Sequence, residues 1–273
     1  MNPGLRPHAA LLAMLGFLIP LAAHAQSGDP DPERFTEEID AFARWDAKNA
    51  PPDDPIVFVG SSSIRFWNTA ERFPLLPIVN RGFGGAHISD VNHFLEQTVL
   101  RYAPSVIVFY AGDNDIGAGK SKETVLEDYG VFVQSVWSDA PSAQIVFIPI
   151  KPSLARWELW PEMEHANQLV RDFSQRDDRL HYVDVATPML GEDGRPRPEL
   201  FIRDGLHMTA EGYDVWTGPL AEYLASLERS TSSVAARAHA LRSAHRSGLT
   251  VQTARGSSPF APVKTSTTPA SQR

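Results

Sequence analysis

One short stretch near the start of the chain constrains the fold most, because it joins a buried strand to a cluster of hydroxyl groups. Residues 56–59 are Ile-Val-Phe-Val, and Gly60 and three serines, 61–63, follow directly. An apolar run of this length between Pro55 and Gly60 is typical of a strand buried on both faces of a parallel sheet. Open α/β sheets bind ligands at the carboxyl ends of their strands, where these serines stand. The stretch therefore predicts an α/β fold with a polar site at this strand end.

Strand and helix patterns alternate along the rest of the chain. Runs of β-branched and aromatic residues predict strands, and apolar residues at helical spacing predict helices between them. The predicted strands are residues 56–59, 77–80, 105–110, 143–150 and 181–184, and the predicted helices are residues 33–48, 63–68, 89–102, 124–137, 161–175 and 209–227. Alternation of this kind indicates right-handed βαβ units. We therefore predict a three-layer α/β/α sandwich with a five-stranded parallel sheet.

Residues 1–25 have the pattern of a secretory signal peptide. Arg6 precedes an apolar segment, residues 9–22, and a small-x-small cleavage signal ends at Ala25. The segment is shorter than the roughly 20 residues that a spanning helix needs, which favours cleavage over the alternative of a membrane anchor. No other stretch of the sequence predicts a membrane span. We expect an exported protein, either periplasmic or secreted.

Charge divides the remaining chain into a body and a tail. Of the 25 basic residues, one lies in the signal peptide and six lie in residues 230–273, which contain no acidic residue. The body, residues 26–229, therefore has 18 basic residues against all 33 acidic ones, a net charge of -15. An acidic body argues against a nucleic-acid partner. The tail is rich in Ser, Thr, Ala, Arg and Pro, so we expect most of it to be disordered, with a transient helix open as an alternative over residues 235–247. We expect its positive charges to contact an anionic envelope surface.

Four short blocks carry side chains from which a serine nucleophile and its partners could be assembled. They are residues 60–63 (Gly-Ser-Ser-Ser), 80–85 (Asn-Arg-Gly-Phe-Gly-Gly), 112–115 (Gly-Asp-Asn-Asp) and 203–208 (Arg-Asp-Gly-Leu-His-Met). A serine is a weak nucleophile unless a base takes its proton, and His207 is the candidate base. The chain has no cysteine, which excludes a thiol nucleophile and a disulfide framework. The Gly-x-Ser-x-Gly and His-Glu-x-x-His motifs are also absent.

In their order along the chain, these blocks resemble those of the SGNH (GDSL-type) hydrolase superfamily, named for Ser, Gly, Asn and His. The resemblance runs from about residue 55 to about residue 216. The matching residues are Ser62 in Gly60-Ser61-Ser62, Gly85 in the second block, Asn114 in the third, and Asp204 and His207 in Asp204-Gly205-Leu206-His207. Ser61 departs from the family pattern, which has Asp at this position, but the departure leaves the nucleophilic hydroxyl in place.

The resemblance implies a serine esterase on a flavodoxin-like fold, working without a cofactor or a metal. Ser62 would attack an acyl carbon, His207 would carry the proton, and Asp204 would hold the imidazole. The oxyanion hole would consist of the backbone N–H groups of Ser62 and Gly85 and the side-chain amide of Asn114. Gly85 has no side chain, so its backbone could approach the substrate closely.

Plainer interpretations of these residues remain open from sequence alone. Ser61 or Ser63 could be the nucleophile in place of Ser62. A serine after a strand is often only a helix cap, and Asp204 could likewise cap the last helix.

The acidic and histidine residues near the second and third blocks are also open. Asp113 and Asp115 could suggest a metal site, although we expect Asp115 to organise the loop around Asn114. His87 and His93 are expected to be surface or capping residues.

The substrate is the least constrained part of the prediction. Arg156 and Trp157 lie in a predicted loop, residues 151–160, and either line the acyl or alcohol pocket or merely pack. Export is compatible with a small-molecule ester or a glycan ester. The alternatives are a carbohydrate O-acetyl esterase with the same catalytic residues and a catalytically silent binding module, because a fold does not guarantee an activity.

Overall fold

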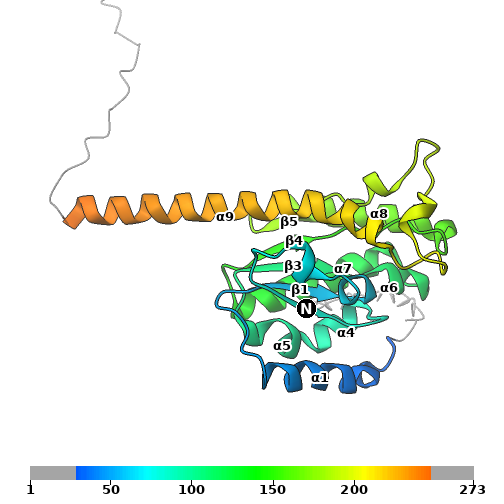
Figure 1. The fold of residues 1–273 in the computed structure, drawn as a ribbon, viewed down its shortest axis with the longest axis horizontal. Helices are drawn as coiled ribbons and strands as arrows, with labels where there is room; N and C mark the ends of the chain where they lie inside the picture. Colours follow the sequence, from blue (N-terminus) through cyan, green and yellow to red (C-terminus); the bar gives the residue numbers. More distant parts are fainter. Residues whose placement is uncertain (1–28, 247–273) are drawn as a thin grey trace, which may run out of the picture. The chain divides into compact units, whose positions relative to one another are not determined.

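The computed structural model describes residues 29–246 (Figure 1). The chain forms two compact units, Met1–Pro219 and Leu220–Arg273. All four sequence blocks lie in the first unit. The predicted signal peptide and residues 247–273 lie outside the described residues.

The first unit contains a five-stranded sheet in which every pair of neighbours is parallel. The strands are β1 (Ile56–Gly60), β2 (Ile78–Gly82), β3 (Val106–Tyr110), β4 (Gln144–Phe147) and β5 (Leu180–Tyr182). Their order across the sheet is β2-β1-β3-β4-β5, so the direction of chain progression reverses between β1 and β3. The predicted α/β fold with five parallel strands is confirmed, and this reversal is where such sheets bind ligands.

Helices connect the strands. They are η1 (Pro32–Phe35), α1 (Thr36–Asp46), α2 (Ser62–Arg65), α3 (Thr69–Arg72), α4 (Ile88–His93), α5 (Leu95–Thr98), η2 (Leu100–Tyr102), α6 (Asp113–Gly117), α7 (Lys122–Asp139), η3 (Trp157–Leu159), α8 (Trp160–Ser174), η4 (Thr187–Met189), η5 (Pro198–Leu200) and α9 (Ala210–Arg246).

Two predicted helices differ from the structure. The predicted helix over residues 89–102 is three short helical turns, α4, α5 and η2, which share one buried face. Apolar periodicity does not distinguish one helix from successive turns that keep the same face inward. The last helix, predicted to end at residue 227, continues to Arg246. For residues 230–246 the sequence predicts mostly disorder, with at most a transient helix from residue 235. Residues 220–246 contain neither Gly nor Pro, and their Ala, Leu and Arg favour helix.

Both faces of the central strands are buried, which explains the uninterrupted apolar run in β1. On one face, Val57 and Val59 belong to a core that also includes residues of α1, α4, α5, α7 and α8; Figure 1 shows α1, α4 and α5 together on one side of the sheet. On the other face, Phe58 packs against Trp67, with ring centroids 5.5 Å apart, and Trp67 packs against Trp216 at the same distance. Alternate residues of a strand point to opposite faces, so one run supplies both cores.

Gly60 lets β1 and β3 approach at the edge where the polar blocks gather. Its φ is +142°, and a Cβ atom there would lie 1.8 Å from the carbonyl oxygen of Tyr110. The same carbonyl accepts the N–H of Ser61 at 3.0 Å. Any side chain at residue 60 would push the two strands apart, so this position requires glycine.

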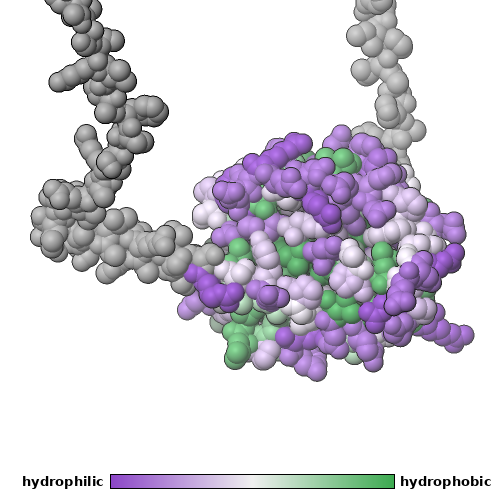
Figure 2. Space-filling view, turned by 90° about the horizontal axis from the view of Figure 1, so that it is seen from above, coloured by the Kyte–Doolittle hydropathy of each residue, from purple (hydrophilic) through white to green (hydrophobic). Residues whose placement is uncertain are grey.

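Polar residues cover most of the face seen in Figure 2, and the apolar residues there form small separate groups. Among residues 29–246, no helix combines the length and the hydropathy needed to cross a membrane.

Candidate active site

Ser62, His207 and Asp204 form a continuous chain of hydrogen bonds. The His207 Nε2 atom lies 3.1 Å from the Ser62 hydroxyl, and His207 Nδ1 lies 2.6 Å from Asp204 Oδ2. Ser61 and Ser63 are buried, and neither makes a hydrogen bond to His207 within the described part of the chain. The geometry therefore selects Ser62 among the three serines.

The serine is held by the junction of β1 with a short helix. Ser61 is extended, with φ -85° and ψ -162°, and Ser62 is the first residue of α2. The first N–H groups of a helix have no helical acceptor. The N–H of Ser62 accordingly makes no backbone hydrogen bond within residues 29–246 and is available to a substrate oxygen.

The histidine is held by a tight turn that Asp204 stabilises twice. Asp204 Oδ1 accepts the N–H groups of Leu206 and His207, both at 2.9 Å, while its other oxygen holds the imidazole. Gly205 adopts a φ of +67° within the turn. The side chain of Phe66 meets the imidazole edge to face, with ring centroids 5.1 Å apart. The imidazole is thus oriented by a carboxylate, a turn and an aromatic ring.

Asp204 does not cap the last helix, which was the alternative from sequence. The N–H of Gly212, in the first turn of α9, donates to the hydroxyl of Thr209 at 3.2 Å. Burial disfavours ionisation of Asp204, but the hydrogen bonds from His207 and from the N–H of Leu206 outweigh it and lower the pKa of Asp204 to about 2. The carboxylate is therefore ionised at any pH near neutrality. It favours the tautomer that carries a proton on Nδ1 and leaves Nε2 to accept one from Ser62.

The remaining predicted residues are Gly85, in the loop after β2, and Asn114, at the start of α6 in the connection after β3. Gly85 has a φ of +79°, and a Cβ atom there would meet nothing within 4 Å. The positive φ favours glycine at this position, and the open space beside it leaves the expected close approach of a substrate possible. The Asn114 Nδ2 atom donates to the carbonyl of Ala86 at 3.1 Å, which joins the two loops. The second hydrogen of this amide has no acceptor among the described residues.

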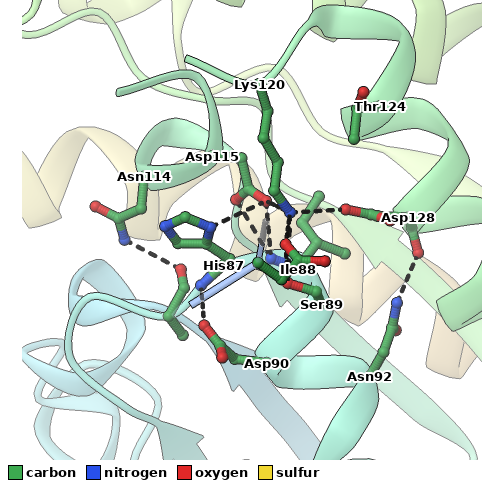
Figure 3. Close-up of polar contacts among 12 residues, drawn as sticks. His87, Ile88, Ser89, Asp90, Asn92, Asn114, Asp115, Lys120, Thr124 and Asp128 are labelled. Atoms are coloured by element: carbon green, nitrogen blue, oxygen red, sulfur yellow. Dashed lines mark hydrogen bonds and ion pairs between the residues drawn. The ribbon is translucent and has the colours of Figure 1, made fainter. Parts of the chain in front are cut away.

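An ionic cluster centred on the buried side chains of Asp115 and Lys120 joins these two segments (Figure 3). Asp115 accepts the N–H of Ile88, 3.2 Å from each carboxylate oxygen. The Lys120 ammonium lies 3.1 Å from both Asp115 and Asp128, and it also pairs with Asp29. Burial disfavours the ammonium, but these carboxylates outweigh it and raise the pKa of Lys120. The cluster ties the chain after Gly85 to the chain after Asn114.

The neighbouring residues that the sequence left open are now placed. His87 is the N-cap residue of α4 but is buried, 3.9 Å from Asp115, whereas His93 is exposed. Asp113 and Asp115, the alternative metal ligands, pair with different cations: Asp113 with Lys151 and Arg156, and Asp115 with Lys120.

Arg156 and Trp157 point to different surroundings. The guanidinium of Arg156 donates from Nη2 to Asn114 Oδ1 at 3.0 Å. Trp157 stacks on Trp160 and lines a cavity of about 500 Å³, together with Leu154 and part of residues 191–198. The triad residues do not line this cavity.

Sequence reasoning missed Lys151, whose ammonium lies 3.2 Å from Asp113 and 3.1 Å from the hydroxyl of Tyr110. Lys151 is almost fully buried. The sequence did contain a sign of this residue. Lys151 directly follows the predicted strand at residues 143–150, so it falls at the edge of the sheet where the candidate site lies. A buried lysine needs an anionic partner, and Asp113 is the partner here.

The profile of the GDSL-like Lipase/Acylhydrolase family matches residues 61–215, more than half of the chain. The match includes Ser62, Gly85, Asn114, Asp204 and His207. No curated protein matches the chain.

Several solved structures share the fold. A Streptococcus pneumonia protein named for platelet activating factor is 24% identical; the match covers 70% of this chain and 93% of that one, with a TM-score of 0.63. A GDSL-like lipase from Bacteroides thetaiotaomicron is 18% identical, with 69% and 98% covered and a TM-score of 0.60. An acetyl xylan esterase is 17% identical, with 62% and 98% covered and a TM-score of 0.53. At these identities the likeness shows the fold alone.

Proposed function

The chain belongs to the GDSL-like lipase/acylhydrolase family, and we propose that it is a serine esterase that hydrolyses carboxylic esters through an acyl-enzyme intermediate. The observation that carries the proposal is the chain of hydrogen bonds from Asp204 through His207 to Ser62. It supplies a nucleophile, a base within reach of its proton, and a carboxylate that orients the base.

In the first half of the reaction, the Ser62 oxygen attacks the ester carbonyl carbon while its proton passes to His207 Nε2. The carbonyl π electrons move onto oxygen, and the resulting imidazolium is stabilised by Asp204. When the tetrahedral intermediate collapses, the bond to the alcohol oxygen breaks and the alcohol takes the proton from Nε2. The acyl group remains on Ser62.

In the second half, His207 takes a proton from water as the water attacks the acyl carbon. Collapse of the second tetrahedral intermediate breaks the bond to Ser62, which recovers its proton from the imidazolium. Both intermediates carry an oxyanion, for which the N–H groups of Ser62 and Gly85 and the free N–H of Asn114 are suitable donors.

A second candidate substrate class is an O-acetylated carbohydrate. One solved structure with the same fold is named as an acetyl xylan esterase. The cavity that Trp157 lines supports this candidate, because Trp157 offers an aromatic surface and Glu158 and Asp193 offer hydrogen-bonding groups. A catalytically silent binding module is less well supported, since the hydrogen-bonded triad is complete.

The decisive experiment is labelling with a serine-directed fluorophosphonate, followed by peptide mass spectrometry. Wild type should gain the label on Ser62 and lose ester turnover in proportion. Ser62→Ala should gain neither label nor activity, whereas Ser138→Ala, a change at an exposed serine on α7, should behave as wild type. Label on Ser61 or Ser63, or turnover by Ser62→Ala, would refute the assignment. A panel of acetyl, butyryl and longer-chain esters, with acetylated xylan alongside, then separates the two substrate classes.

We also propose that the protein is exported and that its basic tail contacts an anionic envelope surface. The support is the signal-like sequence of residues 1–25 and the six basic, unopposed charges in residues 230–273. Mature protein recovered from outside the cytoplasm should begin at Gln26. An intact N-terminus on cytoplasmic protein would contradict export.

A further inference from the structure

We propose that Arg156 is a positioning residue of the active site, whose guanidinium fixes the orientation of the Asn114 amide and strengthens that amide as a donor to the oxyanion. This inference rests on the proposed esterase function. It assigns to Arg156 a role different from the pocket-lining role expected from sequence.

The orientation of Asn114 is decided by the chemistry of its two neighbours. Arg156 offers only N–H donors, so the atom of Asn114 that faces it at 3.0 Å must be the carbonyl oxygen. Ala86 offers a carbonyl oxygen, so the atom that faces it at 3.1 Å must be the amide nitrogen. If the amide were flipped, the Asn114 oxygen would face the carbonyl oxygen of Ala86. The Asn114 NH2 group would then face the guanidinium of Arg156, and both contacts would be unfavourable. The pair of contacts therefore keeps the N–H groups on the side of the Gly85 loop.

The guanidinium is itself held in place. Its Nη1 atom lies 3.2 Å from Asp113 Oδ2, and Asp113 is anchored by the buried Lys151. Gly117 lies against the guanidinium, because a Cβ atom on Gly117 would be 3.1 Å from the Arg156 Cζ atom. The arginine is thus fixed between a carboxylate, the Asn114 carbonyl and a glycine that leaves room for it.

The charges in this group add up to one surplus positive charge. Burial opposes ionisation of Asp113, but Lys151 and Arg156 outweigh it and keep the pKa of Asp113 below its ordinary value. Burial also opposes the Lys151 ammonium, but Tyr110 and Asp113 outweigh it and raise the pKa of Lys151. Two cations therefore share one carboxylate. A cation bonded to the Asn114 carbonyl polarises the amide, so its N–H is a stronger donor when negative charge develops on the substrate.

The same contacts argue against a direct substrate-binding role for Arg156. Nη2 donates to Asn114, and Nη1 is buried beside Asp113, with which it forms an ion pair but no hydrogen bond. An arginine that bound substrate would need at least one face of its fork open to the ligand. Arg156 therefore acts through Asn114.

The test is a double-mutant cycle between residues 156 and 114, measured as kcat and KM with a small ester. Arg156→Met removes the donors and the charge while keeping length, and should lower kcat about 10- to 100-fold with little change in KM. In the Asn114→Ala background the same substitution should lower kcat less than about twofold, because the group on which Arg156 acts is gone. Arg44→Met, a matched change at an exposed arginine on α1, should leave both parameters unchanged.

A second variant keeps the test available if Arg156→Met does not fold. Gly117→Ala leaves every charge in place and only displaces the guanidinium, so we expect a smaller fall in kcat, about 2- to 5-fold. In the Asn114→Ala background the same substitution should leave kcat unchanged. Equal losses of kcat in both backgrounds, or a rise confined to KM, would overturn the proposal. An Asn114→Ala enzyme with wild-type kcat would also overturn it, but labelling of Ser62 would then still establish the serine esterase.

Discussion

The ring of Phe66 meets the imidazole of His207 at 82°, with the two centroids 5.1 Å apart. Phe66 is more than half exposed, so its contact with the histidine does not arise from membership of the core. An edge-to-face pair of this kind stabilises by about 0.5–1.5 kcal/mol. The contact restrains an imidazole whose side-chain hydrogen bonds, within residues 29–246, are those with Asp204 and Ser62.

Replacing this ring should impair catalysis without unfolding the protein. We expect Phe66→Ala to lower kcat about 3- to 10-fold, which corresponds to losing the stabilisation of the edge-to-face pair. The melting temperature should stay within about two degrees of the wild-type value. Steady-state kinetics and a thermal melt measure both. Phe66→Leu is the control for bulk, and it should recover less than half of the loss. Wild-type kcat in Phe66→Ala would mean that the ring does not restrain the histidine.

Asn114→Ala should remove one of the three oxyanion donors. The expected loss in kcat is about 10²- to 10³-fold with little change in KM, as for other single oxyanion donors. Asn92→Ala is a suitable control, because this asparagine donates to the carbonyl of Asp128 in the supporting layer and not to the site. A change confined to KM would show that Asn114 binds substrate in the ground state only.

The pH dependence of kcat/KM should show one ionisation on its acid side. Asp204, with its pKa lowered to about 2, stays ionised through the working range, so the imidazole is the group that must lose a proton before it can accept one. Activity should rise with pH and then reach a plateau. Asp204→Asn removes the carboxylate that orients the imidazole and stabilises the imidazolium formed during the reaction, so the plateau should fall.

Each profile should be repeated with EDTA. The triad works without a metal, so the chelator should change neither profile. Activity that EDTA abolishes, or an Asp204→Asn enzyme indistinguishable from wild type, would rule out the triad as drawn.

Lys120 should be far more important to stability than its neighbour Lys122. Lys120→Met leaves the buried Asp115 and the partly buried Asp128 without their cation, and removing one partner of a buried ion pair costs about 3–5 kcal/mol of unfolding free energy. Lys122→Met breaks only more exposed pairs with Glu123 and Glu162, which are worth about 0–1 kcal/mol. Urea denaturation compares the two directly. Similar losses in both variants would show that the cluster in Figure 3 is not a major source of stability.

Deleting residues 230–273 should leave small-ester activity and the melting temperature nearly unchanged. Every residue of the proposed site lies in the unit that ends at Pro219. Binding to vesicles that contain phosphatidylglycerol should fall sharply on deletion, since six positive charges are removed. Equal binding before and after deletion would exclude the tail as the membrane-surface contact, and a large drop in melting temperature would show that it stabilises the body.

The parts of the structure that could be predicted from sequence are those that rest on local patterns. The five apolar runs gave the strands, and the position of Ser62 directly after one of them indicated the edge on which the site lies. The contacts of Arg156 could not be predicted, because they depend on how a loop after β4 packs against the loop after β3. The breaks between α4, α5 and η2 were also missed, since turns with one buried face keep the periodicity of a helix. The length of α9 was not predicted, because the composition of residues 230–273 as a whole favours disorder, whereas residues 220–246 taken alone contain neither Gly nor Pro.

The nucleophile and its base stand 145 residues apart in the chain. A chain that is synthesised or translocated N-terminus first presents Ser62, Gly85 and Asn114 long before the turn that carries Asp204 and His207 emerges. Since a serine without its base is a weak nucleophile, a growing chain cannot hydrolyse esters until nearly all of the first unit has emerged and folded. For the proposed esterase, the order of the blocks would therefore delay ester hydrolysis to the end of biosynthesis.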